Sequence, residues 1–337
     1  MSSNSTFQFP VPVGGAPLEI DFTPSIVFCI LYALLVPLAV YRLISPRSRS
    51  IVLLGTTGFT IERVVSYALR AYAARNDGPR ESPGLETYLQ TALSAGYITI
   101  AQDLLNLLRA LLVKSTVGTA PSSSSAAGST PMYVFKASTQ GADHSGESGY
   151  QGSTAGLLEE SEREDQPRLR QRIRHVCGIV SLVFLTAIVV NVIGVVDFKD
   201  AMKTGTHSSL VQQMRYASAA IVLLLLDVLS WGAFYAFWFL PRVPKGPAMF
   251  IVVVSLLLSA VGHYRMVVMA HWTTSLTSMA PGAQNSRRDK IFFYVFHVAP
   301  EWLAAALLMS VNAREMFRTG PWGDIRTSDK RRPSTGN

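Results

Sequence analysis

Long runs of apolar residues constrain this chain more than any other feature. The run IVLLLLDVLSWGAFYAFWFL, residues 221–240, carries one charge and lacks the alternation of polar and apolar residues that is typical of a barrel strand. A bilayer core about 30 Å thick is crossed by about 20 helical residues. Because a helix pairs its own backbone groups, such a run can lie in lipid as a helix. The chain is therefore predicted to be an all-α, polytopic membrane protein.

Seven stretches are long enough to cross. Only 15% of the residues are charged, whereas an ordinary soluble domain has about 25%. The second and third stretches carry charges and are alternatively surface helices, but their length and the charges of the connecting loops favour crossing. The predicted transmembrane helix bundle has seven spans, at residues 25–45, 51–73, 87–113, 176–196, 215–240, 248–270 and 291–313.

The basic residues between these stretches predict the orientation. With the N-terminus outside, the cytoplasmic side holds 18 lysines and arginines and the outer side holds 7. The prediction is an extracellular segment at 1–24, spans at 25–113 and 175–313, a cytoplasmic loop at 114–174 and a basic cytoplasmic tail at 314–337. Asn4 begins the sequon Asn-Ser-Thr and would be glycosylated on the outer side.

The loop at 114–174 is rich in serine and glycine, which predicts disorder. Its end is basic, and each arginine there would gain about 1 kcal/mol from anionic lipid, or would serve as an ordinary positive-inside anchor. These residues are Arg168, Arg170, Arg172 and Arg174. The net charge of +8 lies mostly in the connecting segments, so nucleic-acid binding is not expected, and membrane lipids are the predicted partners. Cys29 and Cys177 fall inside apolar runs and predict no disulfide or metal site.

Several polar side chains fall inside the predicted spans, where an ionisable group costs several kcal/mol unless it faces the bundle interior. We interpret them either as interhelical ion pairs that hold the bundle together, or as a polar cavity that binds a lipid headgroup or relays protons. The candidate site residues are Glu62, Arg63, Tyr67, Asp103, Asn106, Arg109, Asp227, Arg265, His297 and Glu301.

Short motifs in these spans resemble the fungal resistance-to-aminocholesterol family of lipid-translocating exporters. They are Phe22-Thr23-Pro24-Ser25, RVVSYALR at 63–70, NLLRALL at 106–112, HYRMVVMAHW at 263–272 and KIFFYVFHVAPEWL at 290–303. The aromatic, arginine and proline positions match, including Tyr67, Arg70, Arg109, Arg265 and Pro300. Four positions that are acidic in the family hold Arg63, Val268, Lys290 and His297.

The resemblance implies a divergent seven-span member of fungal origin. It implies lipid or amphiphile translocation, or a lipid-linked stress response, at the plasma membrane or alternatively an endomembrane or the vacuole. The missing acids imply altered activity. The alternatives are a seven-span sensor or receptor, and a non-transporting scaffold used in stress or host colonisation. A ceramidase-type metal hydrolase is a further alternative, but it needs three histidines and an aspartate around zinc. No enzyme activity and no cofactor are predicted.

Overall fold

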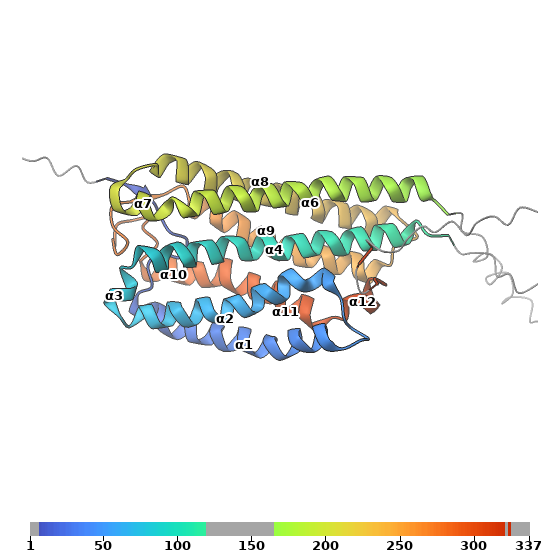
Figure 1. Cartoon of the computed structure of the whole chain (residues 1–337), viewed down its shortest axis with the longest axis horizontal. Coiled ribbons are helices and arrows are strands. Elements are labelled where there is room, and N and C mark those ends of the chain that lie inside the picture. The colour runs from blue at the N-terminus through green and yellow to red at the C-terminus, as the bar shows by residue number, and fades with distance from the viewer. Residues whose placement is uncertain (1–6, 119–164, 321–322, 325–337) are drawn as a thin grey trace, which may run out of the picture.

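The described residues, 7–118, 165–320 and 323–324, form in the computed structural model a bundle of long helices that run along one axis (Figure 1). The long helices are α1 (Phe22–Ile44), α2 (Leu54–Ala74), α4 (Pro83–Ser115), α6 (Pro167–Val196), α8 (Ser208–Phe239) and α9 (Lys245–Val268). The last long segment is α10 (Arg287–Phe293), the π-helical turn η3 (Tyr294–Val298) and α11 (Ala299–Ser310).

Short elements lie at the two ends of the bundle. They are β1 (Phe9–Pro10), η1 (Glu19–Asp21), η2 (Ile51–Leu53), α3 (Asp77–Arg80), α7 (Phe198–Thr204), β2 (Trp272–Thr273) and α12 (Ala313–Met316). Figure 1 shows α3, α7 and α10 at one end and α12 at the other. Residues 9–18, here called the strap, lie at the first end. We call this end the strap end. The other end, where Lys114, Arg170, Arg174 and Arg318 lie, is called the basic end.

Six of the segments are long and apolar enough to cross a membrane, which confirms the prediction of a helical membrane protein. They contain α1, α4, α6, α8, α9 and the α10–α11 segment. Helix α2 has 21 residues and packs between α1 and α4, but it carries three charges, at Glu62, Arg63 and Arg70, and is not among the six. The helix predicted at 51–73 is thus present.

The boundary of the fourth predicted span differs from the structure. Helix α6 begins at Pro167 rather than near 176, so Arg168 to Arg174 belong to its first turns. The prediction that the disordered loop extends to residue 174 was therefore wrong for its basic end. Proline is favoured in the first helical turn because its missing N–H is not needed there. Asn4, the loop at 119–164 and the tail from 325 lie outside the described residues.

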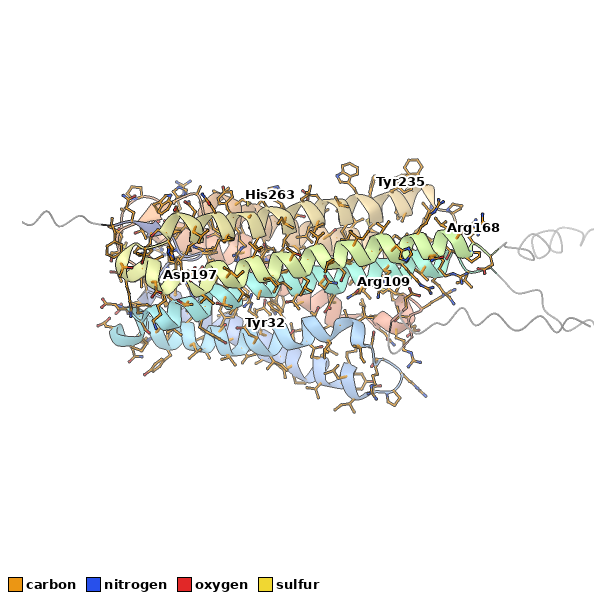
Figure 2. All side chains as sticks on the ribbon, turned by 45° about the horizontal axis from the view of Figure 1, so that its top comes forward. Tyr32, Arg109, Arg168, Asp197, Tyr235 and His263 are labelled. Carbon is orange, nitrogen blue, oxygen red and sulfur yellow. The ribbon has the colours of Figure 1, made fainter. Side chains whose placement is uncertain are left out.

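The outward-facing side chains of the long helices are largely apolar. Leu34 on α1, Ile179 on α6 and Leu224 on α8 are each more than half exposed. Near the basic end, α8 also exposes aromatic residues, among them Trp238 and the Tyr235 labelled in Figure 2. Aromatic side chains are enriched where a bilayer meets water. An apolar face of this extent is typical of a lipid-covered surface.

Candidate functional site

An ion-paired centre lies inside the bundle between α2 and α11. Arg63 donates from Nη2 to Glu301 Oε1 at 2.8 Å and from Nε to Oε2 at 3.2 Å. Its Nη1 donates to Glu62 Oε2 at 2.8 Å. The side chains of Arg63 and Glu301 are 0% exposed, and that of Glu62 is 31% exposed. Removing either partner of such a bidentate pair would leave a buried charge without compensation.

A second arginine extends this centre across α9 and η3. Arg265 Nη1 lies 3.5 Å from His297 Nε2 and donates to the carbonyl oxygen of Leu93 at 3.2 Å. His297 Nδ1 lies 3.9 Å from Glu301 Oε2, and the guanidinium of Arg265 lies 5.2 Å from the ring centroid of Tyr97. The side chains of Arg265, His297 and Tyr97 are buried, and so is Leu93, so the centre is closed on this side as well.

Aromatic side chains cover the ionic centre. The rings of Tyr67 and Tyr32 stack with centroids 5.8 Å apart, and Phe28 lies 6.0 Å from Tyr67. The guanidinium of Arg63 lies 4.4 Å from the centroid of Phe59. A cation over an aromatic face is stabilised by the ring quadrupole. Within the described chain, the buried hydroxyls of Tyr32 and Tyr67 have no hydrogen-bond partner.

The structure brings together six of the ten predicted site residues: Glu62, Arg63, Tyr67, Arg265, His297 and Glu301. The other four lie elsewhere: Asp103, Asn106, Arg109 and Asp227. Asp103 accepts from the backbone nitrogen and hydroxyl of Thr56 at 2.6 and 2.8 Å. Asp227 accepts from Ser259 at 3.2 Å. The remaining two are half-buried further along α4, where Figure 2 shows Arg109 toward the basic end. The prediction of a single centre that contains all ten residues was therefore wrong, because Asp103 and Asp227 contact other partners and Asn106 and Arg109 lie further along α4.

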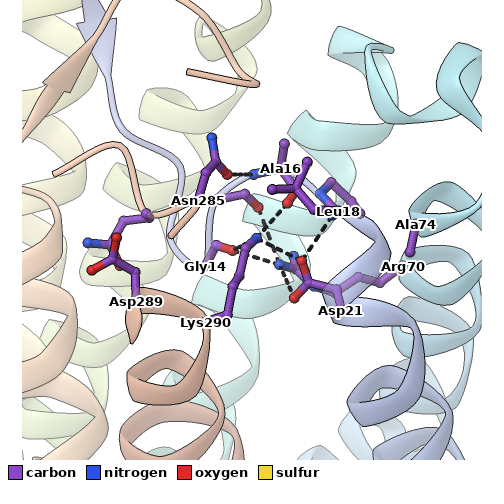
Figure 3. A network of polar contacts seen from close by, with 12 residues as sticks. Gly14, Ala16, Leu18, Asp21, Arg70, Ala74, Asn285, Asp289 and Lys290 are labelled. Carbon is purple, nitrogen blue, oxygen red and sulfur yellow. Dashed lines mark hydrogen bonds and ion pairs between the residues drawn. The ribbon is translucent and has the colours of Figure 1, made fainter. Parts of the chain in front are cut away.

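At the strap end, the strap closes the bundle through a second ionic cluster (Figure 3). Lys290 Nζ lies 2.8 Å from Asp21 Oδ2 and donates to the carbonyls of Gly14 at 2.7 Å and Ala16 at 2.5 Å. Arg70 Nη2 donates to Gly14 at 2.6 Å and to Asp21 Oδ1 at 3.2 Å. Gly14 has φ +80°, a conformation that residues with a β-carbon rarely adopt. The strap carbonyls thus point at two buried cations.

The rest of the strap is also held by hydrogen bonds. Gln90 accepts from Val13 N at 2.9 Å and donates to Val13 O at 3.1 Å. Asn285 accepts from Ala16 N at 3.0 Å, and β1 pairs antiparallel with β2. Because buried backbone groups need partners, these contacts allow an irregular segment to lie inside the bundle.

Sequence reasoning missed this second cluster. Asp21 was assigned to the extracellular segment and Lys290 to an outer loop, although both are buried. Glu86 and Arg215 are buried too, and Gln90 bridges them with hydrogen bonds of 2.8 and 3.2 Å. All these residues stand near the ends of apolar stretches, where a charge is normally read as exposed. The one available signal was Arg70, a cation in the second stretch that had no evident acid nearby.

A lateral groove of about 620 Å³ lies toward the strap end, between α9 and the α10–η3 segment. The size falls within the 300–1,000 Å³ usual for small-molecule sites. Apolar and polar side chains both line it, among them Val267, Phe292, Phe296, His263, His271 and Asp289. The three apolar residues are exposed on the outer surface of the bundle. The groove therefore faces the region that a bilayer would occupy.

One side chain separates the groove from the ionic centre. Tyr264 lines the groove, donates to Gln284 Oε1 at 3.1 Å and has its ring centroid 5.9 Å from that of His297. The π-helical turn carries Phe296 on the groove side and the buried His297 on the interior side. π-Helical turns are rare and occur frequently at functional sites.

In the part of the chain that the structure describes, no group of three or more histidine, cysteine, aspartate or glutamate residues is placed to hold a metal ion. Comparisons with family models, with curated proteins and with solved structures find no match to this chain. The resemblance to the resistance-to-aminocholesterol family stays a prediction that rests on the motifs above.

Proposed function

We propose that this chain is a seven-span integral membrane protein, N-terminus outside, that binds a membrane amphiphile in the lateral groove and moves it between leaflets. The observation that carries the proposal is the groove itself. It is open on the lipid-facing side, has an apolar wall and carries polar groups at the strap end. The resemblance stated above adds the plasma membrane and a lipid-linked stress response to the proposal.

The ion pairing of α2 supports its crossing as the seventh span. The cost of a charge in a bilayer falls when the charge is paired inside the bundle. Arg63 is paired with Glu301 and Glu62, and Arg70 with Asp21. The low apolar content of α2 therefore reflects contacts of its charged residues with neighbouring elements rather than exposure to water.

The groove also suggests how an amphiphile would lie. Acyl chains would contact Val267, Phe292 and Phe296 while the polar group meets His271 and Asp289 at the strap end. Within this centre Arg63 and Glu301 form a bidentate, fully buried ion pair, which favours a structural role for the pair. We therefore place the path of the amphiphile along the bundle surface, with the centre as the rigid support behind it. The proposed movement along such a path is downhill.

A vesicle assay tests this proposal. Purified protein is reconstituted with fluorescently labelled phosphatidylcholine, phosphatidylserine and cholesterol, and dithionite then quenches the outer leaflet. The expected result is quenching beyond one half for at least one lipid. Val267→Trp fills the groove and should abolish that excess. Val253→Trp is the matched control, because Val253 is exposed on the same helix outside the groove.

Two outcomes contradict the proposal. Absence of transfer for all three lipids would favour the scaffold alternative, which the paired centre also suits. Equal transfer by the two tryptophan variants would remove the groove from the path. A sensor or receptor would instead show binding in the groove without any transfer.

A further inference from the structure

A hollow of about 250 Å³ lies at the basic end, at the opposite end of the bundle from the groove. It forms where α4 ends, α6 begins and the chain continues beyond α12. The polar side chains in its wall are Lys114, Arg170, Arg174, Arg318, Thr319 and Asp324. Four of these six are cations and one is an acid. A neighbouring hollow of about 210 Å³ shares Lys114 and Arg318 and adds Arg242.

Two of the arginines are fixed in place by ion pairs. Arg174 donates to both carboxylate oxygens of Asp324, from Nε at 2.9 Å and from Nη2 at 3.1 Å. Arg170 pairs with Asp165, and its Nε donates to Thr116 Oγ1 at 3.3 Å. Pairing holds the two guanidinium groups at the wall. It also means that the excess positive charge comes from other residues.

That excess comes from Lys114 and Arg318. Both side chains are exposed, and within the described ranges neither makes an ion pair. Beside them, Thr319 is 8% exposed. Its buried Oγ1 has no hydrogen-bond partner among the residues that the structure describes. Arg318 has φ +50°, an unusual backbone conformation for a residue with a β-carbon. Strained backbone of this kind is enriched at ligand sites.

We infer that this hollow binds a phosphomonoester group. A tetrahedral, doubly charged oxyanion needs several donors from different directions, and arginine, lysine and a hydroxyl supply such charge-assisted hydrogen bonds. Lys114 and Arg318 reach it from two separate segments, while Thr319 offers the neutral donor. The volume admits a phosphorylated headgroup of about the size of one sugar ring.

The position of the hollow points to a lipid headgroup as the source. The aromatic side chains of α8 lie near the same end of the bundle, as Tyr235 and Arg168 in Figure 2 show. Such aromatic residues mark the interface between bilayer and water. In the proposed orientation this end faces the cytoplasmic leaflet, where anionic lipids gather. Only that last step uses the proposed topology, and the groove is not involved.

Binding to the purified full-length protein in detergent tests the inference. The probes are dioctanoyl phosphatidylinositol bisphosphate, soluble inositol trisphosphate, inorganic phosphate and dioctanoyl phosphatidylcholine, measured by microscale thermophoresis. The bisphosphate lipid is expected to bind, with an affinity that falls as salt rises. Phosphatidylcholine should not bind at this site, since it has no phosphomonoester.

The test variant combines Lys114→Gln with Arg318→Gln. It should weaken binding about thirtyfold, because each cation contributes about 1 kcal/mol and about 1.4 kcal/mol corresponds to a factor of ten. The control combines Arg168→Gln with Arg172→Gln, which removes two exposed cations from the same end outside the hollow. The control should change binding less than twofold. Thr319→Val tests the neutral donor and should weaken binding without altering the salt dependence.

The outcomes separate the possibilities. Tighter binding of the lipid than of inositol trisphosphate supports a membrane source, and equal binding supports a soluble phosphorylated ligand in the same hollow. Equal losses in the test and control variants would overturn the inference in favour of a diffuse basic surface. Absence of binding for every phosphorylated probe would overturn it outright. The result is independent of lipid transfer in vesicles, so either proposal can fail alone. Thermal melting of each variant confirms that it is folded.

Discussion

Arg63 and Glu301 are 238 positions apart in the chain, yet two parallel hydrogen bonds of 2.8 and 3.2 Å join them in the middle of the bundle. Both side chains are fully buried. This pair ties α2, the least apolar of the long helices, to the last long segment. The arrangement makes the ionic centre a determinant of the whole bundle.

Breaking this pair should destabilise the protein more than removing it. Arg63→Met leaves Glu301 buried without its cation and should cost about 3–5 kcal/mol. Combining Arg63→Met with Glu301→Gln should recover most of that loss, because no buried charge is left uncompensated there. Thermal melting in detergent, followed by size-exclusion chromatography, measures the difference. Glu62→Gln is the control and should cost less than about 1 kcal/mol, since Glu62 is partly exposed. A double variant as unstable as the single one would contradict the structural role.

Two helical glycines offer a sharper test of packing at the same centre. A β-carbon on Gly96 would lie 2.3 Å from Arg63 Nη2 and 2.3 Å from the ring of Phe59, whereas one on Gly58 would meet nothing within 4 Å. Gly96→Ala should therefore lower stability by about 1–3 kcal/mol through overpacking. Gly58→Ala should be neutral or raise stability by up to about 1 kcal/mol, as expected for alanine in a helix. Melting curves of the two variants, measured side by side, give the difference in stability. A Gly96→Ala protein as stable as the unsubstituted protein would mean that Arg63 lies elsewhere.

Loss of Lys290 should release the strap. Val13 is 0% exposed, so Val13→Cys should react slowly with a maleimide once Cys29 and Cys177 are replaced by alanine. Adding Lys290→Ala removes one ion pair and two hydrogen bonds to carbonyls. Hydrogen bonds to charged groups contribute about 1.5–3 kcal/mol each, so labelling should become at least about ten times faster.

The control for strap release is Phe7→Cys, because Phe7 is 39% exposed in the intact protein. It should react quickly with and without Lys290. Slow labelling of Val13→Cys in both backgrounds would show that the strap is held by its other contacts alone.

The crossing of α2 can be decided with two cysteines. Arg47 is exposed before α2, and the side chain of Asp77 is 87% exposed after it. If α2 spans the membrane, Asp77→Cys should react with an impermeant maleimide on intact cells, and Arg47→Cys only after permeabilisation. The same cysteine-free background serves both. Labelling of both sites from one side would mean that α2 does not cross.

The bundle could be read from the sequence, but its ionic contacts could not. Each predicted span corresponds to a helix, because an apolar run of that length has few other structures in lipid. Partners such as Arg63 and Glu301 depend on which helices become neighbours, which no local pattern states. Asp227 shows the opposite error: its depth suggested the centre, but its side chain contacts Ser259. Helix rotation decides that contact. Asp21 and Lys290 were missed because charges at span ends are usually solvated, and here the strap covers them.

The strap has a consequence for how the protein is made. Gly14 leaves the ribosome 276 residues before Lys290, its hydrogen-bond partner at the strap end of the bundle. At about 5–20 residues per second, translation separates them by roughly tens of seconds. The segment that seals the bundle is thus synthesised first and docks last, after the final helix has been inserted. Resistance of residues 9–18 to an added protease should then report that a newly made chain is complete, and truncated chains ending before residue 287 should remain open to cleavage there.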